Sequence, residues 1–138
     1  MTIRTDSAIR RRHKTGAPPM ILELHHIQLA MPEGGEDAAR RFYGGVLGLT
    51  EVAKPEALAG RGGVWFEGRS LRLHLGVETP FVPAHKAHPA FRVADLAALR
   101  FHFDAVGIEA RPDIDLPGLR RLYVSDPFGN RIELCETV

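Results

Sequence analysis

The chain has 138 residues, 44% of them apolar, which is long enough to bury a hydrophobic core. No apolar run approaches the roughly 18 residues that a membrane-spanning helix needs, so we expect no membrane segment. The formal net charge is +1 at pH 7, and the single cysteine, Cys135, excludes an internal disulfide framework and suits a reducing cytoplasm.

Residues 1–20 differ in charge from the rest of the chain. They hold five of the 18 basic residues and one of the 17 acidic residues, so residues 21–138 are mildly acidic. The segment lacks the apolar stretch of a secretory signal and any helical stripe. We predict a flexible basic extension without a specific partner, followed by one domain over 21–138. Nucleic-acid binding through the extension is a weaker alternative.

The domain is expected to begin with an apolar strand, "LELHHIQLA" (22–30), that carries two adjacent histidines. An amphipathic stretch from about Glu36 follows and ends at Gly48, where a helix C-terminus favours a residue that tolerates positive φ. Two further strands, "GGVWFEG" and "LRLHLG", flank the turn "EGRS". These elements predict a first module over 21–78.

The second half of the chain repeats this order of elements. "RFYGGVLGL" (41–49) aligns without a gap on "RFHFDAVGI" (100–108), and His74 follows Gly48 by the same 26 residues as Glu133 follows Gly107. Around this helix lie "HPAFRV", "RRLYVSD", the turn "DPFGN" and "RIELC". We predict a second module over 85–138 and an α+β fold in which the two modules share one core.

Strand alternation divides the side chains of both modules into two faces. One face is aliphatic and is expected to pack under the helix, whereas the other gathers His26, His74, His88 and Glu133. Three imidazoles and one carboxylate suit a divalent first-row metal such as Fe, Mn, Ni, Co or Zn. If the modules meet about a pseudo-twofold axis, the two pairs converge on one ion. Ordinary solvent-facing strand positions are the alternative interpretation.

Residues of the same parity as the expected metal ligands are candidates for substrate binding. By the offset between the modules, Val64 corresponds to Tyr123, which places Phe66 rather than Trp65 inside the cavity. The candidates are Gln28, Phe66, Arg72, Arg92, Tyr123 and Arg131.

These motifs resemble the vicinal oxygen chelate superfamily, which includes glyoxalase I, fosfomycin resistance proteins, extradiol dioxygenases and bleomycin resistance proteins. The resemblance rests on "HHIQLAMP" with "RFYGGVLGL" and on "HPAFRVADL" with "YVSDPFGNRIEL", and it covers about residues 22–137. It implies paired βαβββ modules that form an open, mostly antiparallel, barrel-like sheet around a cavity. It also implies metal ligands at His26, His74, His88 and Glu133, and often a homodimer, with side-by-side or exchanged modules.

The resemblance implies a cytoplasmic, divalent-metal-dependent enzyme that acts on a small oxygenated molecule bound to the ion. A lyase, isomerase, thiol transferase or dioxygenase would fit, with Glu133 as general base. Glyoxalase I itself is disfavoured, because that enzyme places a carboxylate where His74 stands. The alternative is a non-catalytic protein that binds a small molecule or antibiotic, as bleomycin resistance proteins do.

Overall fold

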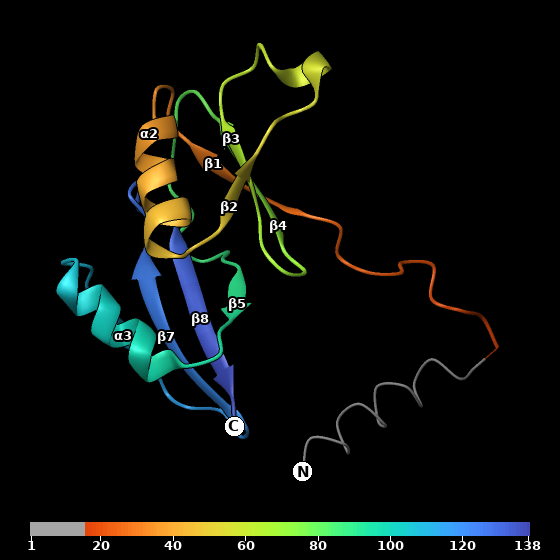
Figure 1. The fold of residues 1–138 in the computed structure, drawn as a ribbon. Coiled ribbons are helices and arrows are strands. Elements are labelled where there is room, and N and C mark those ends of the chain that lie inside the picture. The colour runs from red at the N-terminus through yellow and green to blue at the C-terminus, as the bar shows by residue number, and fades with distance from the viewer. Residues whose placement is uncertain (1–15) are drawn as a thin grey trace.

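The computed structural model describes residues 16–138 as two modules of the same topology (Figure 1). The first module contains one four-stranded sheet, and its helix continues into a wider turn of π-helical type. Its elements are β1 (Ile27–Met31), α2 (Glu36–Ala39), η1 (Arg40–Val46), β2 (Thr50–Val52), η2 (Glu56–Leu58), β3 (Val64–Glu67) and β4 (Arg72–Val77).

The second module has the same sequence of one strand, one helix and three strands. Its elements are β5 (Ala90–Arg92), α3 (Leu96–Ala105), β6 (Arg111–Pro112), β7 (Leu119–Ser125) and β8 (Arg131–Thr137). The strand orders are β1-β4-β3-β2 and β5-β8-β7-β6, with the first pair of each sheet parallel and the remaining pairs antiparallel. The predicted α+β fold of paired βαβββ modules is confirmed, as two mixed sheets that do not close into a barrel.

Both predicted helices end at the expected glycines. Gly48 and Gly107 have φ values of +76° and +78°, a left-handed conformation that glycine adopts without steric cost. Asp95 caps α3, because its side chain accepts a hydrogen bond from the Ala98 amide at 3.0 Å.

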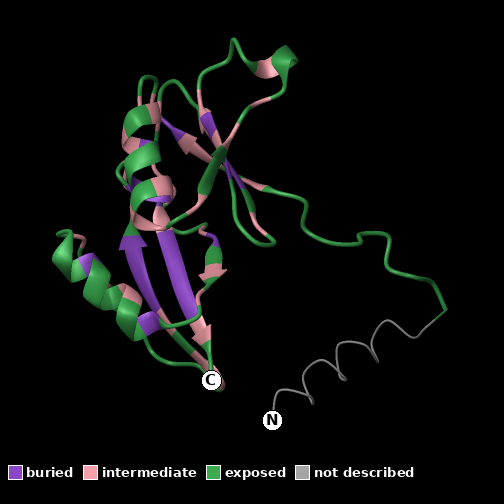
Figure 2. Ribbon diagram, viewed as in Figure 1, coloured by how far each residue is buried: buried purple, intermediate pink, exposed green. Residues whose placement is uncertain are grey.

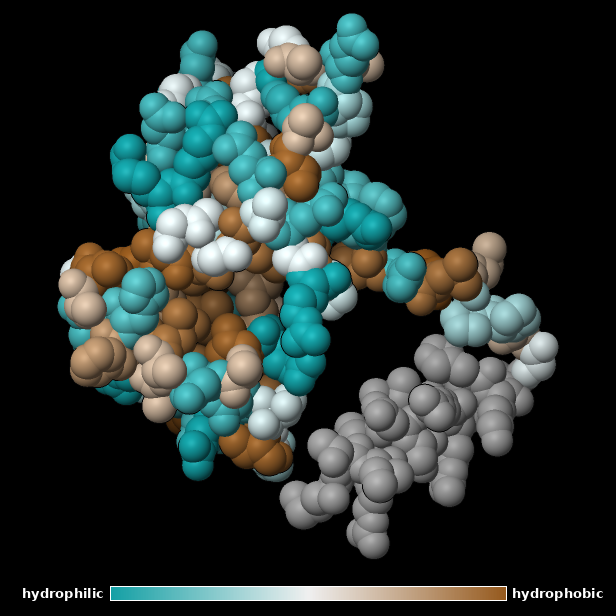
Figure 3. All heavy atoms as spheres, viewed as in Figure 1, coloured by the Kyte–Doolittle hydropathy of each residue, from teal (hydrophilic) through white to brown (hydrophobic). Residues whose placement is uncertain are grey.

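The core lies under the helices, as the aliphatic parity of the strands predicts. Leu73 and Leu75 of β4 are buried, as are Ile132 and Leu134 of β8. The longest buried stretch of strand lies in β8, next to the buried part of β7 (Figure 2). A separate apolar hollow of about 430 Å³, lined in part by Leu47, Leu49, Phe91 and Leu99, opens between the two helices (Figure 3).

The modules are joined by the turn between β7 and β8. The buried Asp126 carboxylate accepts a 2.7 Å hydrogen bond from the Tyr43 hydroxyl of η1. The Asn130 amide donates to the main-chain oxygen of Ala30 at 2.8 Å. Burial, and then the charge of Asp126, raise the pKa of Tyr43, so its phenol stays protonated and continues to donate.

Most of the predicted N-terminal extension, residues 1–20, lies outside the described residues. Residues 16–26 are exposed and lead into β1 away from the modules (Figure 1). Among residues 16–138, no helix has the length and apolar character needed to cross a membrane.

Candidate functional site

The first module stacks two of the predicted ligand residues on each other. His26 directly precedes β1, and His74 lies in the neighbouring parallel strand β4, opposite Gln28. The two imidazole rings are 4.5 Å apart between centroids with an interplanar angle of 24°. The Trp65 indole also stacks on His74, at 3.7 Å and 3°.

This stack leaves His74 only 8% exposed. Burial, followed by the neighbouring His26 and His25, lowers the pKa of His74 from its ordinary value of 6.5, and Glu67 opposes the shift. The imidazole is therefore neutral at pH 7, which is the form that binds a metal through a ring-nitrogen lone pair.

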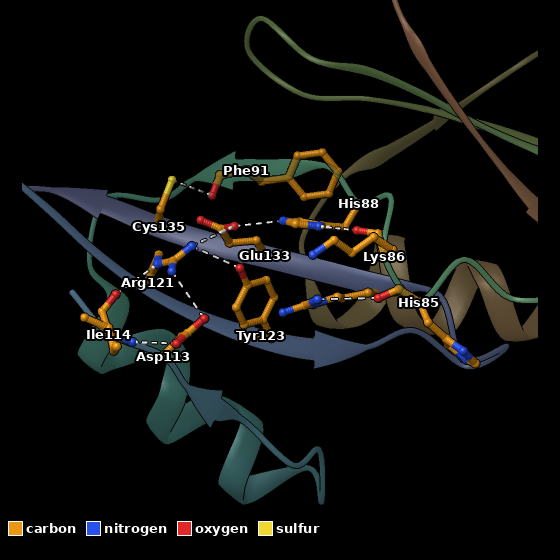
Figure 4. A network of polar contacts seen from close by, with 11 residues as sticks. His85, Lys86, His88, Phe91, Asp113, Ile114, Arg121, Tyr123, Glu133 and Cys135 are labelled. Atoms are coloured by element: carbon orange, nitrogen blue, oxygen red, sulfur yellow. Dashed lines mark hydrogen bonds and ion pairs between the residues drawn. The ribbon is translucent and has the colours of Figure 1, made fainter. Parts of the chain in front are cut away.

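The second module brings His88 and Glu133 into direct contact. His88 lies just before β5, and its Nε2 atom is 2.9 Å from Oε1 of Glu133 on β8 (Figure 4). The other ring nitrogen, Nδ1, is 2.9 Å from the main-chain oxygen of Lys86. A carbonyl only accepts hydrogen bonds, so Nδ1 is the donor to Lys86, and the contact between Nε2 and Glu133 needs a proton on one of those two atoms.

Tyr123 and two arginines surround this pair. The Tyr123 hydroxyl accepts a hydrogen bond from Arg121 at 3.0 Å, and the Arg131 guanidinium lies 3.9 Å above the centre of the phenol ring. Arg121 also lies 3.6 Å from Oε1 of Glu133 and 3.2 Å from Asp113 (Figure 4). Burial, then hydrogen bonding and repulsion from Glu133, raise the pKa of Tyr123 against the opposing arginines.

The sequence model of the "Glyoxalase/Bleomycin resistance protein/Dioxygenase superfamily" matches residues 23–134. The chain belongs to this superfamily. A crystal structure described as a glyoxalase family protein from Bacillus anthracis shares 44% identity, covers 88% of this chain and 100% of its own, and has a TM-score of 0.85.

Two further proteins are less similar to this chain in sequence. "Glyoxylase I 4" from Arabidopsis thaliana is 25% identical over 135 residues, which is 90% of this chain and 76% of that protein. A lactoylglutathione lyase from Agrobacterium tumefaciens is 26% identical and has a TM-score of 0.61, covering 87% of this chain and 96% of its own.

The structure pairs the four predicted ligands but does not gather all four. His26 and His74 lie in the first module, and His88 and Glu133 lie in the second. Among residues 16–138 of one chain, no group of three or more His, Cys, Asp or Glu side chains is arranged to hold a metal ion. The pairs lie beside different hollows, of about 250 Å³ at Gln28 and Trp65 and about 390 Å³ at Tyr123 and Arg131.

The prediction that Phe66 lines the cavity is wrong. Phe66 is 1% exposed and packs in the core 5.8 Å from Tyr43, whereas Trp65 is paired with His74 across the strands and shares its face. Four residues separate the paired Glu67 and Arg72 in the first module, but five separate Ser125 and Arg131 in the second. The shorter turn shifts the register by one residue, which exchanges the two faces of β3.

The other predicted substrate residues lie on the polar faces at different distances from the ligand pairs. Gln28 packs closely beside Gly76. A Cβ added to Gly76 would lie 2.7 Å from the side-chain amide nitrogen of Gln28. Arg72 is exposed and donates to the main-chain oxygen of His25 at 3.2 Å. Arg92 is exposed and sits opposite Cys135 in the register of β5 and β8.

Sequence reasoning missed Arg121, the residue that contacts both Tyr123 and Glu133. It lies two positions before Tyr123 on the same strand, so alternation applied to "RRLYVSD" would have placed it on the polar face. Trp65 was missed because the turn lengths of the two modules differ.

Proposed function

We propose that the protein is a divalent-metal-dependent enzyme whose site is completed by a second copy of the chain. In this homodimer, His26 and His74 of one copy would face His88 and Glu133 of the other. The observation that carries the proposal is that each sheet presents two metal-ligand side chains together on its polar face, next to its edge strand.

The types of donor fit a first-row divalent ion, and in this proposal one chain alone would supply half of each site. Imidazole and carboxylate groups bind Fe, Mn, Ni, Co and Zn, and a stable site needs three or four protein ligands. Each pair within residues 16–138 supplies two. Placing the edge of β1 from one copy beside the edge of β5 from another would bring the pairs together.

Side chains of the second module would then handle the substrate and its proton. Glu133 is 6% exposed and faces His88 and Arg121, and in this proposal it would take a proton from a bound molecule as general base. A bound divalent ion would supply Lewis-acid stabilisation of charge on a substrate oxygen. Tyr123 stays protonated and can donate a hydrogen bond to the same molecule.

The reaction class remains that of a lyase, isomerase, thiol transferase or dioxygenase acting on a small oxygenated molecule. The named relatives support the enzyme class, because one is called a lactoylglutathione lyase and another glyoxylase I. His74 still argues against glyoxalase I chemistry itself, since the resemblance places a carboxylate at this position in that enzyme.

A non-catalytic binding protein is the second candidate. It is favoured by the lack of a three-ligand group among the described residues of one chain. Such a protein would use the same hollows to hold a small molecule without converting it.

Metal content separates the two candidates. Protein purified without a metal-affinity tag, then supplied with Mn, Fe, Co, Ni or Zn in turn, should bind about one ion per chain. His26→Ala and Glu133→Ala should each weaken binding by at least about tenfold. The matched controls His102→Ala and Glu109→Ala change exposed residues outside both pairs and should bind as the unaltered protein does.

Sub-stoichiometric metal in the unaltered protein with every ion, unchanged by the ligand substitutions, would contradict the enzyme proposal and support the binder.

A further inference from the structure

The polar face of the second module is rich in arginine. Arg111 of β6 is paired with Tyr123 of β7, which is itself paired with Glu133 of β8, so all three share one face of the sheet. Arg121 contacts Tyr123 on this face, and Arg131 covers its ring. The acidic residues nearby are Asp113 and Glu133 (Figure 4).

These acidic groups are already occupied by Arg121. Its guanidinium lies 3.2 Å from Oδ2 of Asp113 and 3.6 Å from Oε1 of Glu133. The other oxygen of Asp113 accepts a 2.7 Å hydrogen bond from the Ile114 amide. Both oxygens of Asp113 thus have partners other than Arg111 and Arg131.

Arg111 and Arg131 have neutral contacts instead. Arg111 donates to the Ser125 hydroxyl at 3.2 Å, and Arg131 donates to the main-chain oxygen of His85 at 3.4 Å. Within residues 16–138, no carboxylate lies within 4.0 Å of either guanidinium. Both line the same hollow of about 390 Å³, together with His85, Asp113, Tyr123 and Ser125, and the Asp113 carboxylate in this lining is the ion-pair partner of Arg121.

We propose that this hollow binds the oxyanion of a small ligand, a carboxylate or a phosphonate-like group, between Arg111 and Arg131. The planar guanidinium presents paired N–H donors that match two oxygens of such a group. Stacking on Tyr123 holds Arg131 by its face and leaves its edge donors for the ligand. The Ser125 hydroxyl can add a further hydrogen bond.

The position of the hollow indicates that the oxyanion is the part of the substrate that the protein holds. This inference rests on the proposed function. Tyr123 borders the hollow and lies 5.3 Å from the His88 ring between centroids. An anion held by the two arginines would therefore place the rest of the molecule near His88 and Glu133. Binding of the anion itself requires only the second module.

Calorimetric titration with four probes of similar size tests the charge preference. The full chain, freed of metal by chelator treatment and dialysis, is titrated at low salt with benzoate, phenylphosphonate, benzamide and benzamidine. Benzoate or phenylphosphonate should bind at least about tenfold more tightly than neutral benzamide, and cationic benzamidine should bind least. The stronger of the two anions identifies the preferred headgroup.

Substitutions locate the binding. Arg111→Gln and Arg131→Gln should each weaken anion binding about tenfold, which corresponds to about 1.4 kcal/mol. Arg120→Gln is the matched control, since it removes the same charge from an exposed position of opposite parity on β7, and should change affinity less than about twofold. Arg131→Lys keeps the positive charge but loses the paired N–H donors of the guanidinium. It replaces Arg131→Gln in the test if that variant fails to fold.

The proposal is overturned if neither benzoate nor phenylphosphonate binds more tightly than benzamide. An Arg120→Gln effect as large as that of the other two substitutions would also overturn it. Metal binding is measured on separate, untreated portions of the same proteins after each ion is supplied, and this measurement separates the anion result from the proposed function. Anion selectivity without stoichiometric metal binding would leave the oxyanion site standing and remove the enzyme. Metal binding without anion selectivity would leave the proposed enzyme standing and remove the oxyanion site.

Discussion

The two modules share one topology but present different chemistry at equivalent places. In the first, Trp65, His74 and His26 form a stack of rings that lowers the pKa of His74. In the second, the positions paired in the same way hold Tyr123 and Glu133 within a network of charges. A duplicated scaffold can therefore divide a site between one half that supplies neutral ring donors and another that supplies charge.

The two modules keep their arrangement only if the contact between them is stable, and Asp126 is central to that contact. Its carboxylate accepts hydrogen bonds from the Tyr43 hydroxyl, from two main-chain amides and from the Asn130 side chain. Asp126→Ala would leave several of these donors unpaired in a buried turn. We expect a loss of about 3 kcal/mol or more in the free energy of unfolding, measured by urea denaturation.

Tyr43→Phe is the matched control, because it removes only the bond from Tyr43 to Asp126 and keeps the ring in the core. It should cost about 1 kcal/mol. Equal losses for the two substitutions would mean that the Asp126 network is a single contact and not the support of the whole turn.

A smaller effect is expected from removing the aromatic half of the first module's stack. Trp65→Ala uncovers His74, so the pKa of His74 should rise toward 6.5, because burial is the largest cause of its depression. The change can be followed by NMR titration of the imidazole protons. Trp65→Phe keeps an aromatic cover and should preserve most of the shift. An unchanged pKa in Trp65→Ala would show that the tryptophan is not what buries His74.

The same substitution should alter the pH dependence of stability. The pKa of His74 is lower in the folded than in the unfolded chain, so acid protonates the unfolded chain first. The stability that neutral His74 contributes is present above pH 6.5 and is lost as the pH falls through the folded pKa. Trp65→Ala should weaken this dependence, and urea denaturation over that range would measure it.

Much of the fold could be predicted from the sequence because its signals are local or repeated. The helix ends at Gly48 and Gly107 and the aliphatic parity of β4 and β8 follow from spacing alone. The pairs His26 with His74 and His88 with Glu133 also follow, since parallel neighbours place these positions on one face.

Other features depend on contacts that no local pattern contains. One residue fewer in the turn of the first module moved Phe66 into the core and Trp65 onto His74. The bond from Asp126 to Tyr43 spans 83 positions in the chain. Whether the two ligand pairs meet within a chain or between chains is set by how sheets pack, and alternation along a strand says nothing about that.

Mixed dimers test most directly whether two copies build each site together. Chains carrying His26→Ala and chains carrying Glu133→Ala, with different affinity tags that bind no metal, are co-expressed, and the mixed dimer is isolated by both tags. Our account predicts about half the metal of the unaltered protein, because one of the two sites then combines an intact His26–His74 pair with an intact His88–Glu133 pair. Metal no higher than in either variant alone would contradict it.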